Sequence, residues 1–330
     1  MTFETPFDET VYLEAVPAEG DTLAELTEYA RAAEAAGFDA LGFPLGRALE
    51  PTTLLSALAV RTTTLGLVAD VSPAYAAPYN VARYLATLDH LSRGRAGWRL
   101  VATDPPAFAD LHGGAAPAPP RRAARAAEYL DLLPRLWDSW DDDAIPADRE
   151  HGVYVDEAKI RETRWTGPEF RVHGPLDVPR SPQGHPVLAV EVVDAQTLDL
   201  AVAHADLAVL GAPTVEGARG LLAELAARAP ARLRPVLALP ADAAPTAAEL
   251  SALVEAGFAG FRLELDRAGL DRVAADVLPA LGGRPVPTAP VVPAVGGAGR
   301  NTFRDRLGLA RPRDRSAEGP ADRVEFGAFA

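Results

Sequence analysis

The chain of 330 residues contains no cysteine. Disulfide bonds, thiolate nucleophiles and zinc sites with thiolate ligands are therefore excluded. The sequence also has no apolar run of the ~18 to 20 residues that a membrane-spanning helix needs, so no membrane partner is expected. Its acidic start, MTFETPFDET, lacks the positive charge and apolar stretch of a secretory signal. Together these absences favour a cytoplasmic protein.

Positive charge is also scarce. The chain has 32 lysine and arginine residues against 46 aspartate and glutamate residues, a formal net charge of −14. Such a chain does not attract a phosphate backbone, so no nucleic-acid partner is expected. The six histidines show neither H-x-H nor H-x-x-x-H spacing, and we predict no metal site. No G-x-S-x-G motif marks a nucleophilic serine.

Short β-type runs alternate with longer helix-type segments along most of the chain. Four βα units occupy the first half, and four more follow after a break. Eight βα units in series, with right-handed crossovers, are typical of a TIM (βα)8 barrel, so we predict an α/β protein of this fold. A doubly wound open sheet would show the same alternation. Its phosphate-binding glycine fingerprint follows none of the predicted strands, so the barrel is favoured.

We expect a single barrel domain over residues 1–285, with an insertion at residues 141–184 after the fourth βα unit. The insertion is too long for an ordinary connection. Residues 286–330 are expected to form a Pro/Gly-rich, largely irregular tail, in which only Thr302 to Leu309 has a pattern that could fold against the barrel. The acidic run from Asp138 to Asp143 is interpreted as a solvated helix exit rather than a cation site.

The stretch from Leu88 to Thr103, LDHLSRGRAGWRLVAT, joins the end of a predicted helix to a buried strand through a tight basic turn. The pattern L-D-H-L-S-x-G-R-A-G-W resembles a segment of the bacterial-luciferase-like flavin monooxygenases, in the branch that includes the nitrilotriacetate and desulfurisation monooxygenases. Further tracts match in the same order, among them Glu50-Pro51, Leu136 to Trp140 and Gly174-Pro175-Leu176. The resemblance therefore extends over nearly the whole chain.

This resemblance implies a two-component monooxygenase. Members of the family bind reduced FMN supplied by a separate flavin reductase, add O2 to it and oxygenate a small organic substrate. The protein's task is to hold the cofactor and to exclude water. The resemblance also implies a homodimer.

Ligand groups of a TIM barrel come from the carboxyl ends of its strands, and the family pattern is broken there. Asp70 stands where the family has a threonine near the flavin ring, and Arg99 replaces an asparagine. Asp194 replaces a serine that binds the FMN phosphate, and Ala123 stands where members carry a tyrosine. A carboxylate about 5 Å from a phosphate repels it by several kcal/mol at an effective dielectric near 20. Asp194 is also a candidate cap for the helix that follows.

The candidate catalytic residues are Arg99 and Asp70. The candidate cofactor-binding residues are Ser72, Thr103, Asp194, Gln196 and Thr197.

Side-chain alternation along the strands adds a structural prediction. If Arg99 points into the barrel, Asp70 can face it from the neighbouring strand and form an ion pair. Arg262 and Glu264 share one face of the last strand, and Glu191 is a further candidate. Because buried charges need partners, we predict a polar network of these residues where the family has its flavin cavity.

Three functions stay open from the sequence. The first is an FMN-dependent luciferase-like monooxygenase. The second is a flavin-free paralogue with a degenerate cofactor site that acts as a binding or partner subunit, and the substitutions at Asp70, Arg99 and Asp194 favour it. The third is a barrel repurposed for acid–base chemistry by Glu191 or Glu264.

Overall fold

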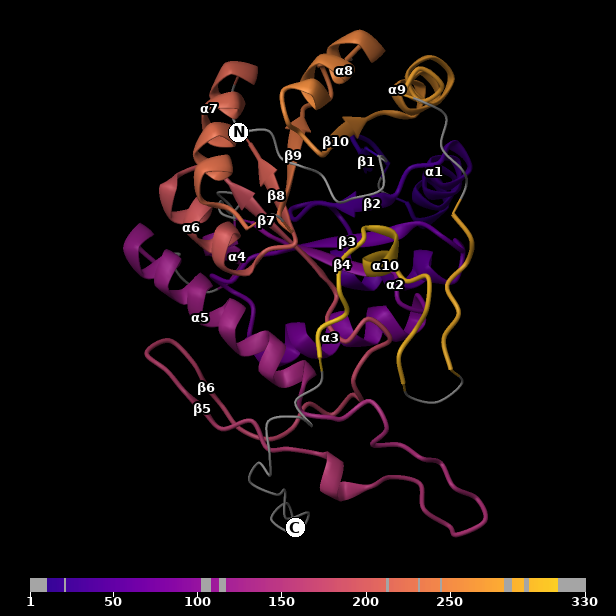
Figure 1. Ribbon diagram of the computed structural model, residues 1–330, viewed down its shortest axis with the longest axis vertical. Helices are drawn as coiled ribbons and strands as arrows, with labels where there is room; N and C mark the ends of the chain where they lie inside the picture. Colours follow the sequence, from indigo (N-terminus) through magenta and orange to yellow (C-terminus); the bar gives the residue numbers. More distant parts are fainter. Residues whose placement is uncertain are drawn as a thin grey trace.

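The fold is a closed barrel of eight parallel strands with helices in the connections (Figure 1). The computed structural model describes residues 11–20, 22–101, 108–112, 117–211, 214–230, 232–243, 245–281, 287–293 and 297–313. Around the barrel the strands follow the order β1-β10-β9-β8-β7-β4-β3-β2. Their bounds are β1 Tyr12–Pro17, β2 Ala40–Phe43, β3 Gly66–Val71, β4 Ala96–Leu100, β7 Val187–Val192, β8 Leu207–Leu210, β9 Arg234–Leu239 and β10 Gly260–Leu265. The predicted TIM barrel is confirmed.

Helices surround this barrel, as Figure 1 shows. They are α1 Leu23–Ala36, α2 Pro51–Ala59, α3 Pro78–Leu91, α5 Pro119–Trp137, α6 Ala195–His204, α7 Val215–Arg228, α8 Ala247–Glu255 and α9 Arg267–Arg272, with the short α4 Phe108–Leu111 before α5. The Asp266 side chain caps α9 by accepting the Gly269 N–H at 2.6 Å. The helix continues as a π-helical turn, η2 Val273–Val277. None of the described helices combines the length and apolarity needed to cross a membrane.

The turn between α3 and β4 is organised by a buried arginine. The Arg95 guanidinium donates to the carbonyl oxygens of Leu65 at 2.8 Å and of Ala59 at 2.7 Å, and the second bond satisfies a carbonyl at the carboxyl end of α2. Burial lowers the pKa of Arg95 to about 10, and the nearby Glu34 opposes this shift. Gly94 has φ +86°, a left-handed conformation that favours glycine. The basic turn of the sequence is thus a structural joint between two βα units.

The amino ends of the strands are closed by the carboxy-terminal segment. Helix α10 Phe303–Arg306 places the Phe303 ring against the barrel, where a Cβ on Gly66 would lie 2.8 Å from it. Leu307 and Leu309 join the same apolar cluster, and Arg304 pairs with Asp206 at 2.7 and 2.9 Å. We call Phe303, Leu307 and Leu309 the floor of the barrel. The division of the chain at residue 285 stays a prediction.

The insertion holds a 3-10 turn, η1 Glu157–Lys159, and a two-stranded hairpin of β5 Trp165–Thr166 and β6 Arg171–Val172. In Figure 1 it lies on the side of α3 and α5. The interpretation of the preceding acidic run as solvated is wrong for Asp138 and Asp141, whose exposed fractions are 8% and 7%. Asp138 pairs with Arg180 at 3.0 Å, and Asp141 pairs with Arg161. Basic partners from within the insertion bury these carboxylates.

Candidate functional site

The carboxyl ends of β3, β4 and β7 form the mouth of the barrel, and a buried ion-pair network occupies it. Asp70 and Arg99 are register partners on adjacent strands. Arg99 donates from Nε to Asp70 Oδ1 at 2.8 Å and from Nη2 to Asp70 Oδ2 at 2.5 Å, a bidentate pair. Its Nη1 lies 3.2 Å from Glu191 Oε1. Side-chain alternation along the strands predicted that Asp70, Arg99 and Glu191 lie together, and the structure places them together.

A second buried pair crosses from the first strand to the last. Arg262 Nε lies 3.1 Å from Glu14 Oε1, and the Tyr12 hydroxyl donates to Glu14 Oε2 at 2.9 Å. Gly42 leaves the space for this carboxylate, since a Cβ there would lie 2.0 Å from Glu14 Oε1. The prediction that Arg262 joins the Asp70 network with Glu264 is wrong. Arg262 pairs with Glu14, and Glu264 makes no ion pair with a described residue.

Sequence reasoning missed Glu14, although a signal for it was present. The strand YLEAVP carries one charged residue in an otherwise apolar run, and a buried carboxylate requires a partner. That partner is Arg262, because β1 and β10 close the barrel and bring the two residues into register.

The electrostatics of the mouth keep Arg99 charged. Burial alone would lower the pKa of Arg99, but the hydrogen bonds and charge of Asp70, then the charges of Glu191 and Glu14, raise it above its usual range. Asp70 and Glu191 pair with the Arg99 guanidinium, and the charge of Glu14, which itself pairs with Arg262, also acts on Arg99.

The rim after β7 carries the other candidate residues. Asp194 caps α6 by accepting the Thr197 N–H at 2.8 Å, and Thr197 Oγ1 accepts the N–H groups of Val193 and Asp194 at 3.0 and 3.1 Å. The helix-capping interpretation of Asp194 describes the local geometry, and Gln196 is exposed beside it. Ser72 follows β3, and its Oγ accepts the Ala74 N–H at 3.2 Å. Thr103 lies outside the described residues.

These residues do not fit FMN in the manner that the resemblance implies. At the start of α6, Asp194 places a carboxylate at the expected phosphate position, and three of the local N–H donors already have side-chain acceptors. In the mouth, the Arg99 and Asp70 side chains pair with each other, and both are more than nine-tenths buried. A role for either of them in catalysis stays a prediction.

Comparison with known proteins connects this barrel to a family. Residues 5–294 match the family model described as luciferase-like monooxygenase. The chain belongs to the luciferase-like monooxygenase family. The predicted recognition and the two-component, flavin-dependent monooxygenase type are therefore confirmed at the level of the family.

Individual relatives differ in how much of their length aligns with this chain. One of the subunits of pristinamycin IIA synthase from Streptomyces pristinaespiralis is 39% identical over 303 residues, which are 90% of this chain and 92% of that relative. Nitrilotriacetate monooxygenase component A from Aminobacter aminovorans is 44% identical over 143 residues, 43% of this chain and only 32% of the relative. A riboflavin lyase structure superposes with a TM-score of 0.78 at 20% identity, covers 95% of this chain and 100% of that one, and supports the fold.

Proposed function

We propose that the protein works in a two-component luciferase-like monooxygenase as the barrel that does not hold the flavin. In such an enzyme, a separate reductase supplies reduced FMN, and O2 and a small organic substrate react at a second, flavin-holding barrel. The family match supports the general class of reaction. The relative that matches over nearly its full length is named as one of the subunits of a synthase, which supports a place among several chains.

The observation that carries this proposal is the bidentate pair of Arg99 and Asp70. Replacing a neutral asparagine and threonine by a buried ion pair fills the mouth with two charges, and separating them to admit flavin would leave each one buried without its partner, at a high cost in free energy. The carboxylate of Asp194 adds a repulsion of up to several kcal/mol toward a nearby phosphate, before screening by solvent reduces it. Both changes weaken flavin binding at the same end of the barrel.

Helices α2 and α3 offer a surface for the partner barrel. Val60, directly after α2, and Tyr84 and Leu91 on α3 are exposed, at 69%, 49% and 47%. We propose that a second luciferase-like barrel packs there, and that two copies of this chain pair through the same face when that partner is absent. A cytoplasmic location is part of the same proposal, since reduced FMN must reach the complex from its reductase.

An anaerobic titration with oxidised and reduced FMN tests the flavin-free role. We expect no binding at the barrel mouth of the wild-type chain up to about 1 mM, whereas the triple variant Asp70→Thr/Arg99→Asn/Asp194→Ser gains binding there in the micromolar range, a difference of about 4 kcal/mol. The control variant, Glu224→Thr/Arg219→Asn/Asp242→Ser, makes matched exchanges at exposed positions and should behave as wild type.

Micromolar binding of FMN at the mouth of the wild-type chain would overturn this role and make the chain itself the flavin-holding monooxygenase. Fluorescence quenching of the flavin and its absorbance spectrum report the binding directly, without a known substrate.

A further inference from the structure

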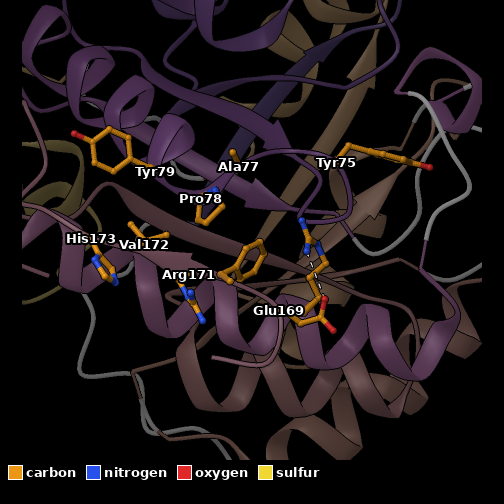
Figure 2. A pocket seen from close by; sticks show the side chains of 10 residues that line it. Tyr75, Ala77, Pro78, Tyr79, Glu169, Arg171, Val172 and His173 are labelled. Atoms are coloured by element: carbon orange, nitrogen blue, oxygen red, sulfur yellow. Dashed lines mark hydrogen bonds and ion pairs between the residues drawn. The ribbon is translucent and has the colours of Figure 1, made fainter. Parts of the chain in front are cut away.

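A cavity of about 560 Å³ lies between the start of α3 and the β5–β6 hairpin. Figure 2 shows Tyr75, Pro78 and Tyr79 along one side of it and Glu169, Arg171 and His173 along the other. Its volume falls in the range of roughly 300 to 1,000 Å³ that is typical of small-molecule sites. None of these residues belongs to the network at the barrel mouth.

The hairpin wall of the cavity is held in place by one carboxylate. Glu128 on α5 accepts hydrogen bonds from Trp165 Nε1 at 2.7 Å, the Glu169 N–H at 2.8 Å and the Phe170 N–H at 3.0 Å. Gly167 is required at this turn, because a Cβ there would lie 1.9 Å from Glu128 Oε1. The cavity is therefore formed before any ligand arrives, which reduces the entropy lost on binding.

Arg125 also lines the cavity. Its guanidinium lies 4.2 Å from the centre of the Phe170 ring, and its Nε donates to the Pro73 carbonyl oxygen at 2.8 Å. The Glu169 carboxylate pairs with two guanidinium groups, that of Arg121 at 2.8 Å and that of Arg125 at 3.5 Å. Of the residues that line the cavity, Arg125 and Arg171 are positively charged and Glu169 is negatively charged, so the lining carries one excess positive charge.

Two further features add positive potential. Arg171 is exposed at the cavity and makes no ion pair with a described residue. Helix α3 begins beside it at Ala77 and Pro78 without a side-chain cap, so the positive end of the helix dipole is not offset. In a chain with a net charge of −14, this cavity is a local site of opposite sign.

We propose that this cavity binds a small molecule with a flat, conjugated body and one carboxylate or phosphate group. The half-buried side chains of Tyr79 and Val172 provide apolar surface for the flat body. Arg171 and Arg125 provide donors of the geometry that carboxylate and phosphate groups accept. The site is separate from the barrel mouth and does not depend on which barrel holds flavin.

Isothermal titration calorimetry of the full chain with 2-naphthoate, and with 2-naphthamide as its uncharged match, tests this site. We expect one saturable site for naphthoate with Kd below about 1 mM, and binding of the amide at least about 10-fold weaker, as expected on loss of a charged hydrogen bond. Arg171→Gln should weaken naphthoate binding by a similar factor. Ala77→Trp, which fills the cavity from an exposed position, should abolish it, while the exposed control Arg219→Gln should have no effect.

Absence of saturable binding would overturn the proposal, and so would equal binding of acid and amide or unchanged binding in Ala77→Trp. FMN itself belongs to the proposed ligand class. Repeating the flavin titration with Ala77→Trp separates the two sites, because flavin bound in this cavity would be lost in the variant and flavin bound at the mouth would not.

Discussion

The floor of the barrel is filled by apolar side chains, whereas the mouth is filled by ionised ones. Phe303 is fully buried at the floor, and Arg99 and Asp70 are buried almost as completely at the mouth. Burying apolar area stabilises a fold by roughly 25 cal/mol per Å². Burying an ion pair is close to neutral, because the cost of desolvation offsets the attraction. The floor is therefore expected to stabilise the barrel, and the mouth to define what the barrel can bind.

The largest expected effect comes from breaking the floor. Phe303→Ala leaves a cavity at the foot of the barrel and should lower the free energy of unfolding by about 3 to 5 kcal/mol. Urea denaturation followed by circular dichroism measures the change. Leu111→Ala at an exposed position is the control and should change stability by less than about 0.5 kcal/mol. A loss below about 1 kcal/mol in Phe303→Ala would show that the floor contributes little.

The mouth should respond differently to single and double changes. Arg99→Met leaves the buried carboxylate of Asp70 without its arginine partner and should lower the free energy of unfolding by about 3 kcal/mol. Asp70→Leu/Arg99→Met removes both charges of the pair and should recover most of that loss. The same denaturation assay compares the two variants. If the double variant is less stable than the single one, the ion pair stabilises the fold and the contrast with the floor fails.

A smaller effect on stability is expected at Asp142, which binds Arg311 in the segment that follows the floor. Burial alone would raise the pKa of Asp142, but the hydrogen bonds and charge of Arg311, with the charge of Arg180, lower it below the usual value. Asp142→Asn should therefore cost about 1 kcal/mol at pH 7.

The sign of the pH dependence follows from this lowered pKa. Because the folded pKa lies below the unfolded value near 3.9, the stabilisation is complete above about pH 4 and is lost as the pH falls further. Melting temperatures measured from pH 7 to pH 3 should show wild type and Asp142→Asn converging at the acid end. A constant gap at every pH would contradict this titration.

The sequence predicts the barrel well because each strand and helix depends on local pattern. The strands and helices follow the predicted alternation of short β-type and longer helix-type segments. The Arg99–Asp70 pair could also be predicted from the sequence, because β3 and β4 follow each other in the chain and are neighbours in the sheet. The partner of Arg262 could not, because β1 and β10 meet only through closure of the barrel. The cavity beside the hairpin was missed for the same kind of reason, as it joins α3 to residues far along the chain.

The position of the floor in the chain has a consequence for biosynthesis. The last barrel strand ends at Leu265, and Phe303 follows 38 residues later (303 − 265). At about 5 to 20 residues per second, a ribosome needs roughly 2 to 8 s to cover that distance. Each nascent chain therefore passes through an interval in which all eight strands have been made but the foot of the barrel is still open to water. Chaperones that recognise exposed apolar surface have their target during that interval.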